Sequence, residues 1–250
     1  MERNKRIVII GATSAIAEQC ARIWVREGAV EMTLVGRHRQ AIERIVADLV
    51  VRSPSSTFHS EVADFLNPIA IRALVEKICD SGPVDIVLIA HGSLPDQIEC
   101  QQNLEKCQDA LLVNGLSPVM FAEAFAAQME ARGQGTIALI GSVAGDRGRQ
   151  SNYVYGAAKG LVSRYAEGML HRFANTGIKV ILIKPGPTDT PMTAHLRGSG
   201  VKMASAEQVA VEIVKGIAKG KSVVYTPAKW QLIMLIIRHL PFFIFKKLRI

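Results

Sequence analysis

A tyrosine, a lysine and a serine are spaced in this chain as a proton-transfer site requires. Tyr155 and Lys159 stand four residues apart in a segment with a helical pattern, so their side chains share one helix face with Cβ atoms about 6 Å apart. An ammonium beside a phenol favours the phenolate, which predicts a lowered pKa for the tyrosine. Ser142 precedes it by thirteen residues and could hold a carbonyl oxygen. An ordinary helix with an exposed Tyr and Lys has the same spacing, so the surrounding elements must decide.

Short apolar runs alternate with helical patterns along the chain. The runs cover residues 7–10, 32–35, 84–89, 136–140 and 180–183, and the helical patterns cover 15–27, 40–52, 68–80, 116–132 and 153–176. Continuous Val, Ile and Leu runs are typical of strands buried on both faces, and helices between them indicate βαβ units. The sequence therefore predicts an α/β protein with three αβα layers around a doubly wound, mostly parallel sheet.

Size and charge indicate one domain with a distinct end. The 250 residues are 49% hydrophobic, which suits one large α/β domain over residues 1–226, followed by a basic, apolar tail over 227–250. Five basic residues and no acidic ones fall in residues 229–250, so most of the formal charge of +8 belongs to the tail. The remaining body is only mildly basic, and nucleic-acid binding is not predicted.

Cysteine spacing and hydropathy bear on metal binding, on the cellular compartment and on membrane spanning. The four cysteines have no spacing that a metal site would need, so no metal is predicted and all four are expected as reduced thiols in the cytoplasm. No run of 18 apolar residues occurs, and no membrane-spanning helix is predicted.

The turn after the first predicted strand suits a dinucleotide phosphate. Gly11 allows a tight turn and lets backbone amides approach a pyrophosphate at the N-terminus of the next helix. Thr13 and Ser14 could cap that helix or bind phosphate, and Ala15 and Ile16 open it. The turn has a single glycine, so a plain strand-to-helix connection is the alternative interpretation.

The end of the second predicted strand bears on the choice of cofactor. NAD-binding folds of this kind usually place a carboxylate here to hold the ribose 2′-hydroxyl. This chain has Gly36 and then Arg37, and a guanidinium suits a 2′-phosphate through charge-assisted hydrogen bonds. NADP(H) is therefore favoured, with NAD(H) possible; the alternative is that Arg37 is an ordinary surface charge.

Two further strand ends are expected at the same crevice. Strand C-termini line the ligand crevice of an open parallel sheet, and Asp64-Phe65 and Ala90-His91-Gly92 stand at such ends. Asp64 could accept a hydrogen bond from an adenine amino group, and Ala90 and Gly92 allow a ribose to approach closely. His91 is interpreted as a local backbone partner and not as a catalytic group.

These segments, in this order, resemble the short-chain dehydrogenase/reductase family over residues 7 to about 225. The resemblance implies a Rossmann fold, a homo-oligomer, NAD(P)H-dependent chemistry on a ketone and a catalytic set of Ser142, Tyr155, Lys159 and Asn114, the last holding a proton-relay water. It also implies cofactor contacts by Tyr155, Lys159, Pro185, Gly186, Thr188 and Thr190. Two departures from the family pattern are the alanines at 15 and 17 and the His-Gly pair after Ala90.

A narrower resemblance concerns members that reduce the 2-keto pentose of a polyprenyl phosphate during cell-wall synthesis. It rests on residues 141–147, 151–156, 237–241 and 245–250, and it implies a lipid-linked sugar substrate. Residues 230–237 are densely apolar and Lys246-Lys247 follow an aromatic run, a pattern that fits an anchor at the inner face of the plasma membrane. The alternative is that the tail packs on the body or on a second subunit.

Other functions and contacts remain open at this point. A reductase of 3-oxoacyl groups on acyl carrier protein would use the same catalytic set, and a dinucleotide-sensing scaffold would need none of its chemistry. Residues 192–203 are expected to form a flap over the substrate, in which Thr193, His195 and Arg197 could touch a phosphate. Solvated loop side chains are the commoner interpretation of such residues.

Overall fold

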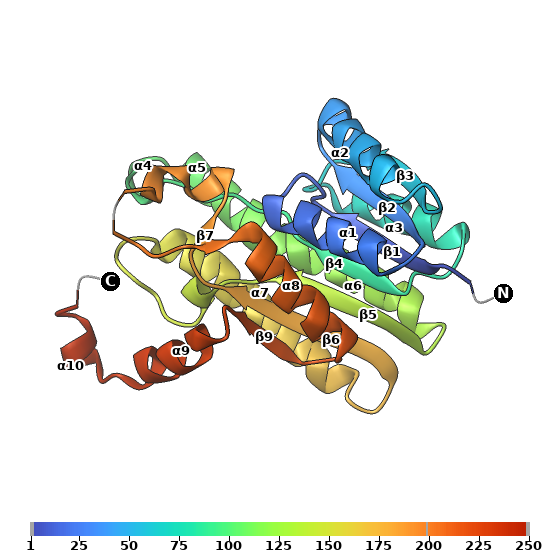
Figure 1. The fold of residues 1–250 in the computed structure, drawn as a ribbon. Helices are drawn as coiled ribbons and strands as arrows, with labels where there is room; N and C mark the ends of the chain where they lie inside the picture. Colours follow the sequence, from blue (N-terminus) through green and yellow to red (C-terminus); the bar gives the residue numbers. More distant parts are fainter. Residues whose placement is uncertain (1–2, 199, 249–250) are drawn as a thin grey trace.

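The fold is a seven-stranded sheet between two layers of helices (Figure 1). The computed structural model describes residues 3–198 and 200–248. The strands run in the order β3-β2-β1-β4-β5-β6-β9, and neighbouring strands are parallel throughout. They are β1 (Lys5–Ile10), β2 (Val30–Gly36), β3 (Thr57–Val62), β4 (Ile86–Ile89), β5 (Gln134–Ile140), β6 (Gly177–Pro185) and β9 (Val223–Thr226). A separate short ribbon pairs β7 (Thr188–Asp189) with β8 (Ala204–Ser205).

The helices divide between the two faces of the sheet. One face is covered by α1 (Ala15–Glu27), α2 (Arg39–Arg52) and α8 (Ala206–Ala218), and the other by α3 (Pro68–Asp80), α6 (Ser117–Glu130) and α7 (Tyr153–Arg172). The remaining helices are α4 (Gln97–Gln102), α5 (Leu104–Leu111), α9 (Lys229–His239) and α10 (Phe242–Phe245), with the π-helical turn η1 (Leu112–Leu116) and the 3-10 turns η2 (Val143–Gly145) and η3 (Pro191–Leu196). The predicted three-layer fold is confirmed.

The burial of successive residues of β1 explains why the strands appear in the sequence as continuous apolar runs. Ile7 and Ile9 pack into the cluster under α1, α2 and α8, whereas Val8 and Ile10 pack into the cluster under α3, α6 and α7. Side chains alternate between the faces of a strand, so a strand covered on both faces needs an apolar residue at every position. Full burial of each such side chain contributes about 1.5–3 kcal/mol relative to exposure.

The sheet strands missed by the sequence pattern are the ones that lack this double burial. Strand β3 reads Thr57–Val62 and alternates exposed with half-buried positions, because it lies at the edge of the sheet. Strand β9 is the opposite edge and is only four residues long. Both edge strands carry too few apolar residues to stand out as buried runs.

The longest apolar helix is part of the core. Helices α5 and α6 are continuous through η1, and Leu104–Glu130 is by length and composition long enough to cross a membrane. The sequence predicted no such segment, because polar residues interrupt the run. More than half of its apolar window is buried in the protein, and Phe121, Phe125 and Met129 are fully buried against the sheet. The segment is thus accounted for as a core helix.

The strand order reverses beside β1, which creates the crevice that holds the site. The chain winds from β1 to β2 and β3 on one side and then returns to place β4 on the other side of β1. Loops leaving β1 and β4 must therefore separate at their C-terminal ends, and ligands of doubly wound sheets bind in that gap. Gly11 follows β1 and Ala90 follows β4, with the Ala90 amide donating to the Ile10 carbonyl over 2.8 Å.

Candidate active site

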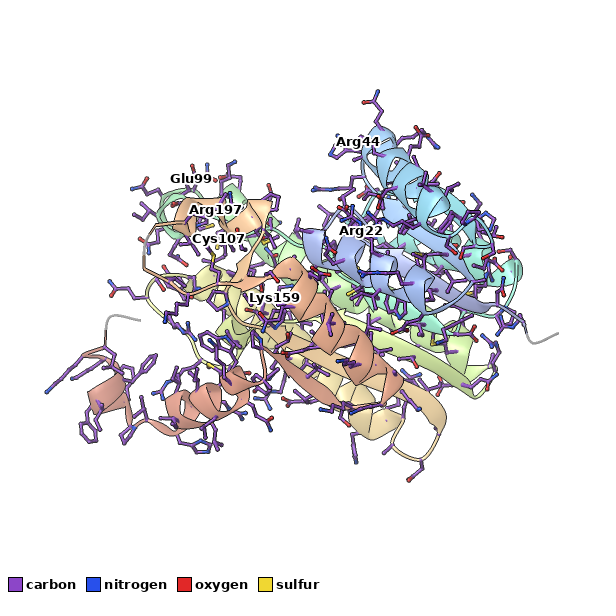
Figure 2. All side chains as sticks on the ribbon, viewed as in Figure 1. Arg22, Arg44, Glu99, Cys107, Lys159 and Arg197 are labelled. Atoms are coloured by element: carbon purple, nitrogen blue, oxygen red, sulfur yellow. The ribbon has the colours of Figure 1, made fainter. Side chains whose placement is uncertain are left out.

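The four residues predicted to be catalytic meet in one pocket of about 180 Å³. Ser142 follows β5 and begins η2, where its Oγ accepts from the Ala144 amide over 3.1 Å. Tyr155 and Lys159 stand on consecutive turns at the start of α7, and Lys159, labelled near the middle of the view in Figure 2, is buried. Asn114 reaches the pocket from η1. The predicted helix spacing thus places both α7 side chains on the inward face.

Lys159 is buried without a carboxylate partner in the described part of the chain. Its Nζ donates to the Ile140 carbonyl over 3.0 Å and lies 5.9 Å from the centre of the Tyr155 ring. Removal from water disfavours the ammonium, and burial lowers the pKa of Lys159 to about 8. The lysine therefore titrates much closer to neutral pH than an exposed lysine does.

The predicted acidification of Tyr155 is wrong in direction. Burial raises the pKa of Tyr155 above its ordinary value, and the hydrogen bond with Ser142 opposes that rise only in part. Loss of hydration destabilises the phenolate more than the neighbouring groups stabilise it. A phenol that stays protonated at neutral pH can donate a proton, so the arrangement favours reduction of a carbonyl over abstraction from an alcohol.

Asn114 is held rigidly by a local departure from the α-helix. It lies in η1, and such π-helical turns occur often at functional sites. Its Oδ1 accepts from the Ser93 amide over 2.8 Å, and its Nδ2 donates to the Ala110 carbonyl over 2.9 Å. A Cβ added to Gly92 would lie 2.8 Å from Asn114 Oδ1 and 3.6 Å from Lys159 Nζ. Gly92 therefore allows the amide and the ammonium to share one small space.

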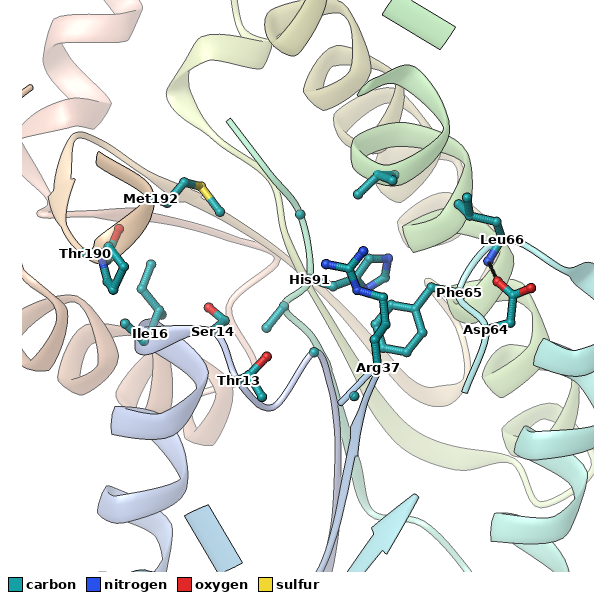
Figure 3. A pocket seen from close by; sticks show the side chains of 17 residues that line it. Thr13, Ser14, Ile16, Arg37, Asp64, Phe65, Leu66, His91, Thr190 and Met192 are labelled. Atoms are coloured by element: carbon teal, nitrogen blue, oxygen red, sulfur yellow. Dashed lines mark hydrogen bonds between the residues drawn. The ribbon is translucent and has the colours of Figure 1, made fainter. Parts of the chain in front are cut away.

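A second cavity, of about 460 Å³, adjoins the catalytic pocket and shares part of its wall (Figure 3). It is lined by Thr190 and by twelve of the residues predicted to bind cofactor at the ends of the first four strands: Gly11, Thr13, Ser14, Ala15, Ile16, Gly36, Arg37, Asp64, Phe65, Ala90, His91 and Gly92. Tyr155, Lys159, Pro185, Gly186 and Thr188 line the catalytic pocket instead. Each predicted cofactor residue thus lies on one of two connected cavities.

Gly11 forms the narrow floor of the larger cavity. Its φ is +84°, and an added Cβ would lie 2.6 Å from the backbone nitrogen of His91. Among the described residues no non-glycine residue has a positive φ, so Ala15 and Ala17 fit the turn without strain and the missing glycines do not distort it. Ser14 begins α1 without a side-chain cap, which leaves its hydroxyl and the first amides of the helix free for an anion.

At the end of the larger cavity that Gly36, Arg37 and Asp64 line, Arg37 is exposed and has no ion-pair partner among the described residues. Asp64 accepts from the Leu66 amide over 2.8 Å through one oxygen, which leaves its other oxygen available. Figure 3 shows Arg37 and Asp64 on one side of the cavity and Thr190 and Met192 on the other.

His91 does not bond the backbone as the sequence suggested. Ser117 Oγ donates to the Phe65 carbonyl over 2.6 Å and so accepts from His91 Nε2 over 2.8 Å. Burial, followed by the charges of Lys159 and Arg37, lowers the pKa of His91 to about 3. The ring is therefore neutral with its proton on Nε2, and Nδ1 is a buried acceptor without a partner in the described structure.

Three polar residues of the catalytic pocket were missed in the sequence, among them Ser93, which follows Gly92. Arg149 and Asn152 lie between η2 and α7 and line the pocket with Ser142 and Tyr155. Their only signal was position, in the loop between two predicted catalytic residues. Thr193 lines the pocket as expected of the flap, but Arg197 pairs with Asp189 at 2.8 Å on the surface.

The tail packs on the body with one side and exposes the other. Met234 is fully buried, and the Trp230 indole lies so close to Gly186 that an added Cβ would meet it at 2.0 Å. Arg147 donates to the Ile237 and Leu240 carbonyls at the end of α9 and stacks 3.8 Å from the Phe245 ring centre. The outward side exposes Leu232, Leu235, Ile236, Phe242 and Phe243. Residues 249–250 of the predicted tail lie outside the described residues.

Known proteins share this sequence pattern and fold. The family model described as short chain dehydrogenase matches residues 5–199. Uncharacterized oxidoreductases of Streptomyces coelicolor and Mycobacterium tuberculosis are each 27% identical, covering 98% and 97% of this chain and 96% of each relative. A short-chain dehydrogenase from Sphingobium yanoikuyae in complex with NADPH superposes with a TM-score of 0.82 at 21% identity, covering 95% of this chain and 96% of that one. An actinorhodin polyketide ketoreductase with NADPH gives 0.79 at 22%, covering 89% and 95%.

Proposed function

Because the chain belongs to the short chain dehydrogenase family, we propose that this NAD(P)-dependent oxidoreductase reduces a ketone to a secondary alcohol. The observation that carries the proposal is the convergence of Ser142, Tyr155 and Lys159 in one pocket that opens into a cavity shaped for a dinucleotide. The relatives are described only as uncharacterized oxidoreductases, so they indicate no substrate. The substrate must therefore be argued from this chain.

The protein groups divide the proton chemistry among themselves. Ser142 donates a hydrogen bond to the ketone oxygen and fixes it beside the phenol of Tyr155, which donates the proton as negative charge develops on that oxygen. The Lys159 ammonium stabilises the phenolate that remains, and Asn114 holds the water through which the phenol is reprotonated. Bound NADPH would supply the hydride.

The larger cavity fits such a dinucleotide. Gly11 leaves space that a Cβ would fill, and the amides at the start of α1 face the same space, as a pyrophosphate requires. His91 Nδ1 offers a buried acceptor that a ribose hydroxyl would satisfy. The unpaired Arg37 supports NADPH over NADH, because a guanidinium gains charge-assisted bonds from a 2′-phosphate and little from a hydroxyl.

We propose the 2-keto pentose of a polyprenyl phosphate as the substrate. The sequence segments on both sides of Tyr155 and in the tail resemble decaprenylphosphoryl-2-keto-ribose reductase. The catalytic pocket, at about 180 Å³, has room for a sugar but not for a long prenyl chain, which would have to leave the pocket. The exposed apolar side of α9 and α10 offers such a chain, or the lipid around it, a surface with basic flanks.

The decisive experiment measures NADPH oxidation by the full-length enzyme with three substrates: a prenyl-phosphate 2-keto-pentose, a 3-oxoacyl thioester and a small neutral ketone. Turnover that is fastest with the lipid-linked sugar and falls by about 10²–10⁴-fold in Tyr155→Phe, with cofactor affinity unchanged, supports the proposal. Preference for the thioester would make the chain an acyl-group reductase. Saturable NADPH binding without reduction of any ketone would indicate a sensing scaffold.

A further inference from the structure

Arg149 is a cation without a counter-ion inside the catalytic pocket. Its Nε is buried and has no hydrogen-bond partner in the described structure. Its Nη2 meets the Met234 sulfur at 3.5 Å, and a thioether is a weak acceptor. A guanidinium has five N–H donors, so most of its hydrogen-bonding capacity is unused.

The nearest acidic group cannot serve this arginine. Asp146 is buried, with its Oδ1 paired to Lys184 Nζ at 2.5 Å and its Oδ2 accepting from the Tyr225 hydroxyl over 2.7 Å. Both oxygens of Asp146 are thus engaged, and no ion pair links Arg149 to any carboxylate in the part of the chain that the structure describes. An unpaired charge that is withdrawn from water is costly unless a ligand supplies the opposite charge.

A neighbouring arginine shows how the same loop satisfies a structural role. Arg147 donates to the carbonyls of Ile237 and Leu240 and stacks on the Phe245 ring, so it fastens the tail to the body. Arg149, two residues on, has none of these contacts and lines the pocket that holds Ser142 and Tyr155. Fastening the tail therefore accounts for Arg147, whereas Arg149 touches the tail only through the Met234 sulfur and keeps its Nε without a partner in the described structure.

A second unsatisfied group lies in the same pocket. Asn152 Oδ1 is buried without a partner in the described structure, and Asn152 lines the pocket beside Arg149. Buried acceptors without partners are rare in folded proteins. An anion for the guanidinium and a hydroxyl for the amide oxygen would satisfy both groups, and both would then belong to one ligand held next to the reacting carbonyl.

We infer that Arg149 is the anion-binding residue of the substrate pocket, taking a phosphate or a carboxylate of a hydroxylated ketone whose hydroxyl donates to Asn152. This inference rests on the proposed ketone reduction and narrows it to anionic substrates. The planar guanidinium can make two parallel hydrogen bonds to either oxyanion. Met234 packs against one edge of the guanidinium and leaves the unpartnered Nε for the ligand.

The test compares matched ketones in wild type, Arg149→Gln, Arg149→Lys and the surface control Arg164→Gln. The ketones are a 2-keto-pentose phosphate, its neutral methyl glycoside and a keto acid of similar size. The comparison shows whether Arg149 binds a phosphate or a carboxylate. In Arg149→Gln we expect the KM of the preferred anionic ketone to rise about 10- to 100-fold, while the KM of the neutral glycoside and the Kd of NADPH stay within about twofold. Arg149→Lys should recover part of the loss, because lysine keeps the positive charge but cannot make the two parallel hydrogen bonds of a guanidinium. Arg164 is exposed and paired with Glu167, so Arg164→Gln should change neither the KM of the ketones nor the Kd of NADPH.

Two outcomes would overturn the inference. An equal rise in KM for neutral and anionic ketones would mean that Arg149 only shapes the pocket, and an unchanged KM for all of them would mean that it binds none. Thermal unfolding provides a second readout. Removing an unpaired, half-buried charge should leave the melting temperature of Arg149→Gln unchanged or higher, whereas loss of a structural contact would lower it.

Failure of the proposed function gives a different result. If the wild-type protein reduces none of the ketones, binding of the pentose phosphate measured by calorimetry still tests Arg149 directly. Phosphate-dependent binding that Arg149→Gln abolishes then supports an anion site without reduction. Binding that is equal in both proteins rejects the site.

Discussion

At the scale of single residues, burial and not pairing sets the protonation states of the site. Lys159 and Tyr155 are both withdrawn from water, so the pKa of the lysine falls and that of the tyrosine rises. The ordinary order of the two pKa values is thereby reversed, with the lysine below the tyrosine. The site thereby keeps a protonated phenol at the pH at which a lysine begins to lose its charge.

The pH profile of reduction should report Lys159. Its pKa is lowered to about 8, so the ammonium is complete below that pH and lost above it, whereas the raised pKa of Tyr155 keeps the phenol protonated throughout. We expect kcat/KM to fall about tenfold per pH unit above pH ~8. In Lys159→Arg, which retains its charge, the decline should move to higher pH. A decline that stays near pH 8 in this variant would assign the titration to another group.

Arg37 should decide between the two nicotinamide cofactors. In Arg37→Gln the 2′-phosphate loses its cation while the ribose contacts remain. We expect the Kd of NADPH, measured by fluorescence titration, to rise about 10- to 100-fold and that of NADH to change little. Arg39→Gln is the matched control, since Arg39 faces Glu43 at 3.8 Å. A similar loss for both cofactors would mean that Arg37 contacts something other than the 2′-phosphate.

At the scale of elements, the sequence indicated the parts buried on both sides and the turns attached to them. Gly11 and Gly92 were predictable because close backbone approach admits only glycine. Helix spacing alone predicted that Tyr155 and Lys159 share a face. Arg149 and the pKa direction of Tyr155 were not predictable, since both depend on which distant groups, Met234 among them, surround a side chain after folding.

The contact between α9 and the loop after β6 offers a test at this scale. In Gly186→Ala the new methyl would meet the Trp230 indole, whose nearest atoms lie 2.0–2.5 Å from the added Cβ. We expect a loss of about 1–3 kcal/mol in unfolding free energy, a shift in tryptophan fluorescence and a lower kcat. Gly148→Ala is the control, because nothing lies within 4 Å of its added Cβ. Equal unfolding free energy, fluorescence and kcat in the two variants would show that α9 shifts to accept the added methyl group.

At the scale of the whole molecule, the outward side of the tail is the feature that a lone chain leaves unexplained. Phe242 and Phe243 are 73% and 64% exposed, and Lys246 and Lys247 follow them. Aromatic side chains beside lysines are typical of segments that lie in a lipid interface. The cytoplasmic setting, the homo-oligomer and the boundary at residue 226 remain predictions from the sequence.

Binding to lipid vesicles tests the tail. We expect the full-length protein to sediment with vesicles that contain phosphatidylglycerol and less with phosphatidylcholine alone, because each lysine near an anionic surface contributes about 1 kcal/mol. The double variant Phe242→Ser/Phe243→Ser should bind at least about tenfold more weakly. Val51→Ser, at a position that is 81% exposed on α2, should bind as wild type.

The same variants separate lipid binding from subunit packing. If Phe242→Ser/Phe243→Ser lowers the oligomeric mass measured by light scattering and leaves vesicle binding unchanged, the tail is a contact between copies of the chain. An unchanged mass with lost vesicle binding supports the membrane surface.

The placement of Trp230 and Met234 has a practical consequence for anyone who shortens this protein. Trp230 packs against Gly186 and Met234 packs against Arg149, two residues that line the catalytic pocket. The same helix, α9, exposes Leu232, Leu235 and Ile236 on its other side. A version cut at residue 226 would lose the support of Gly186 and Arg149 together with the exposed apolar side of α9, so its inactivity would say nothing about lipids. A ligand bound to the outer side of α9 would lie on the helix that supports Arg149 and Gly186, so we expect its binding to alter turnover.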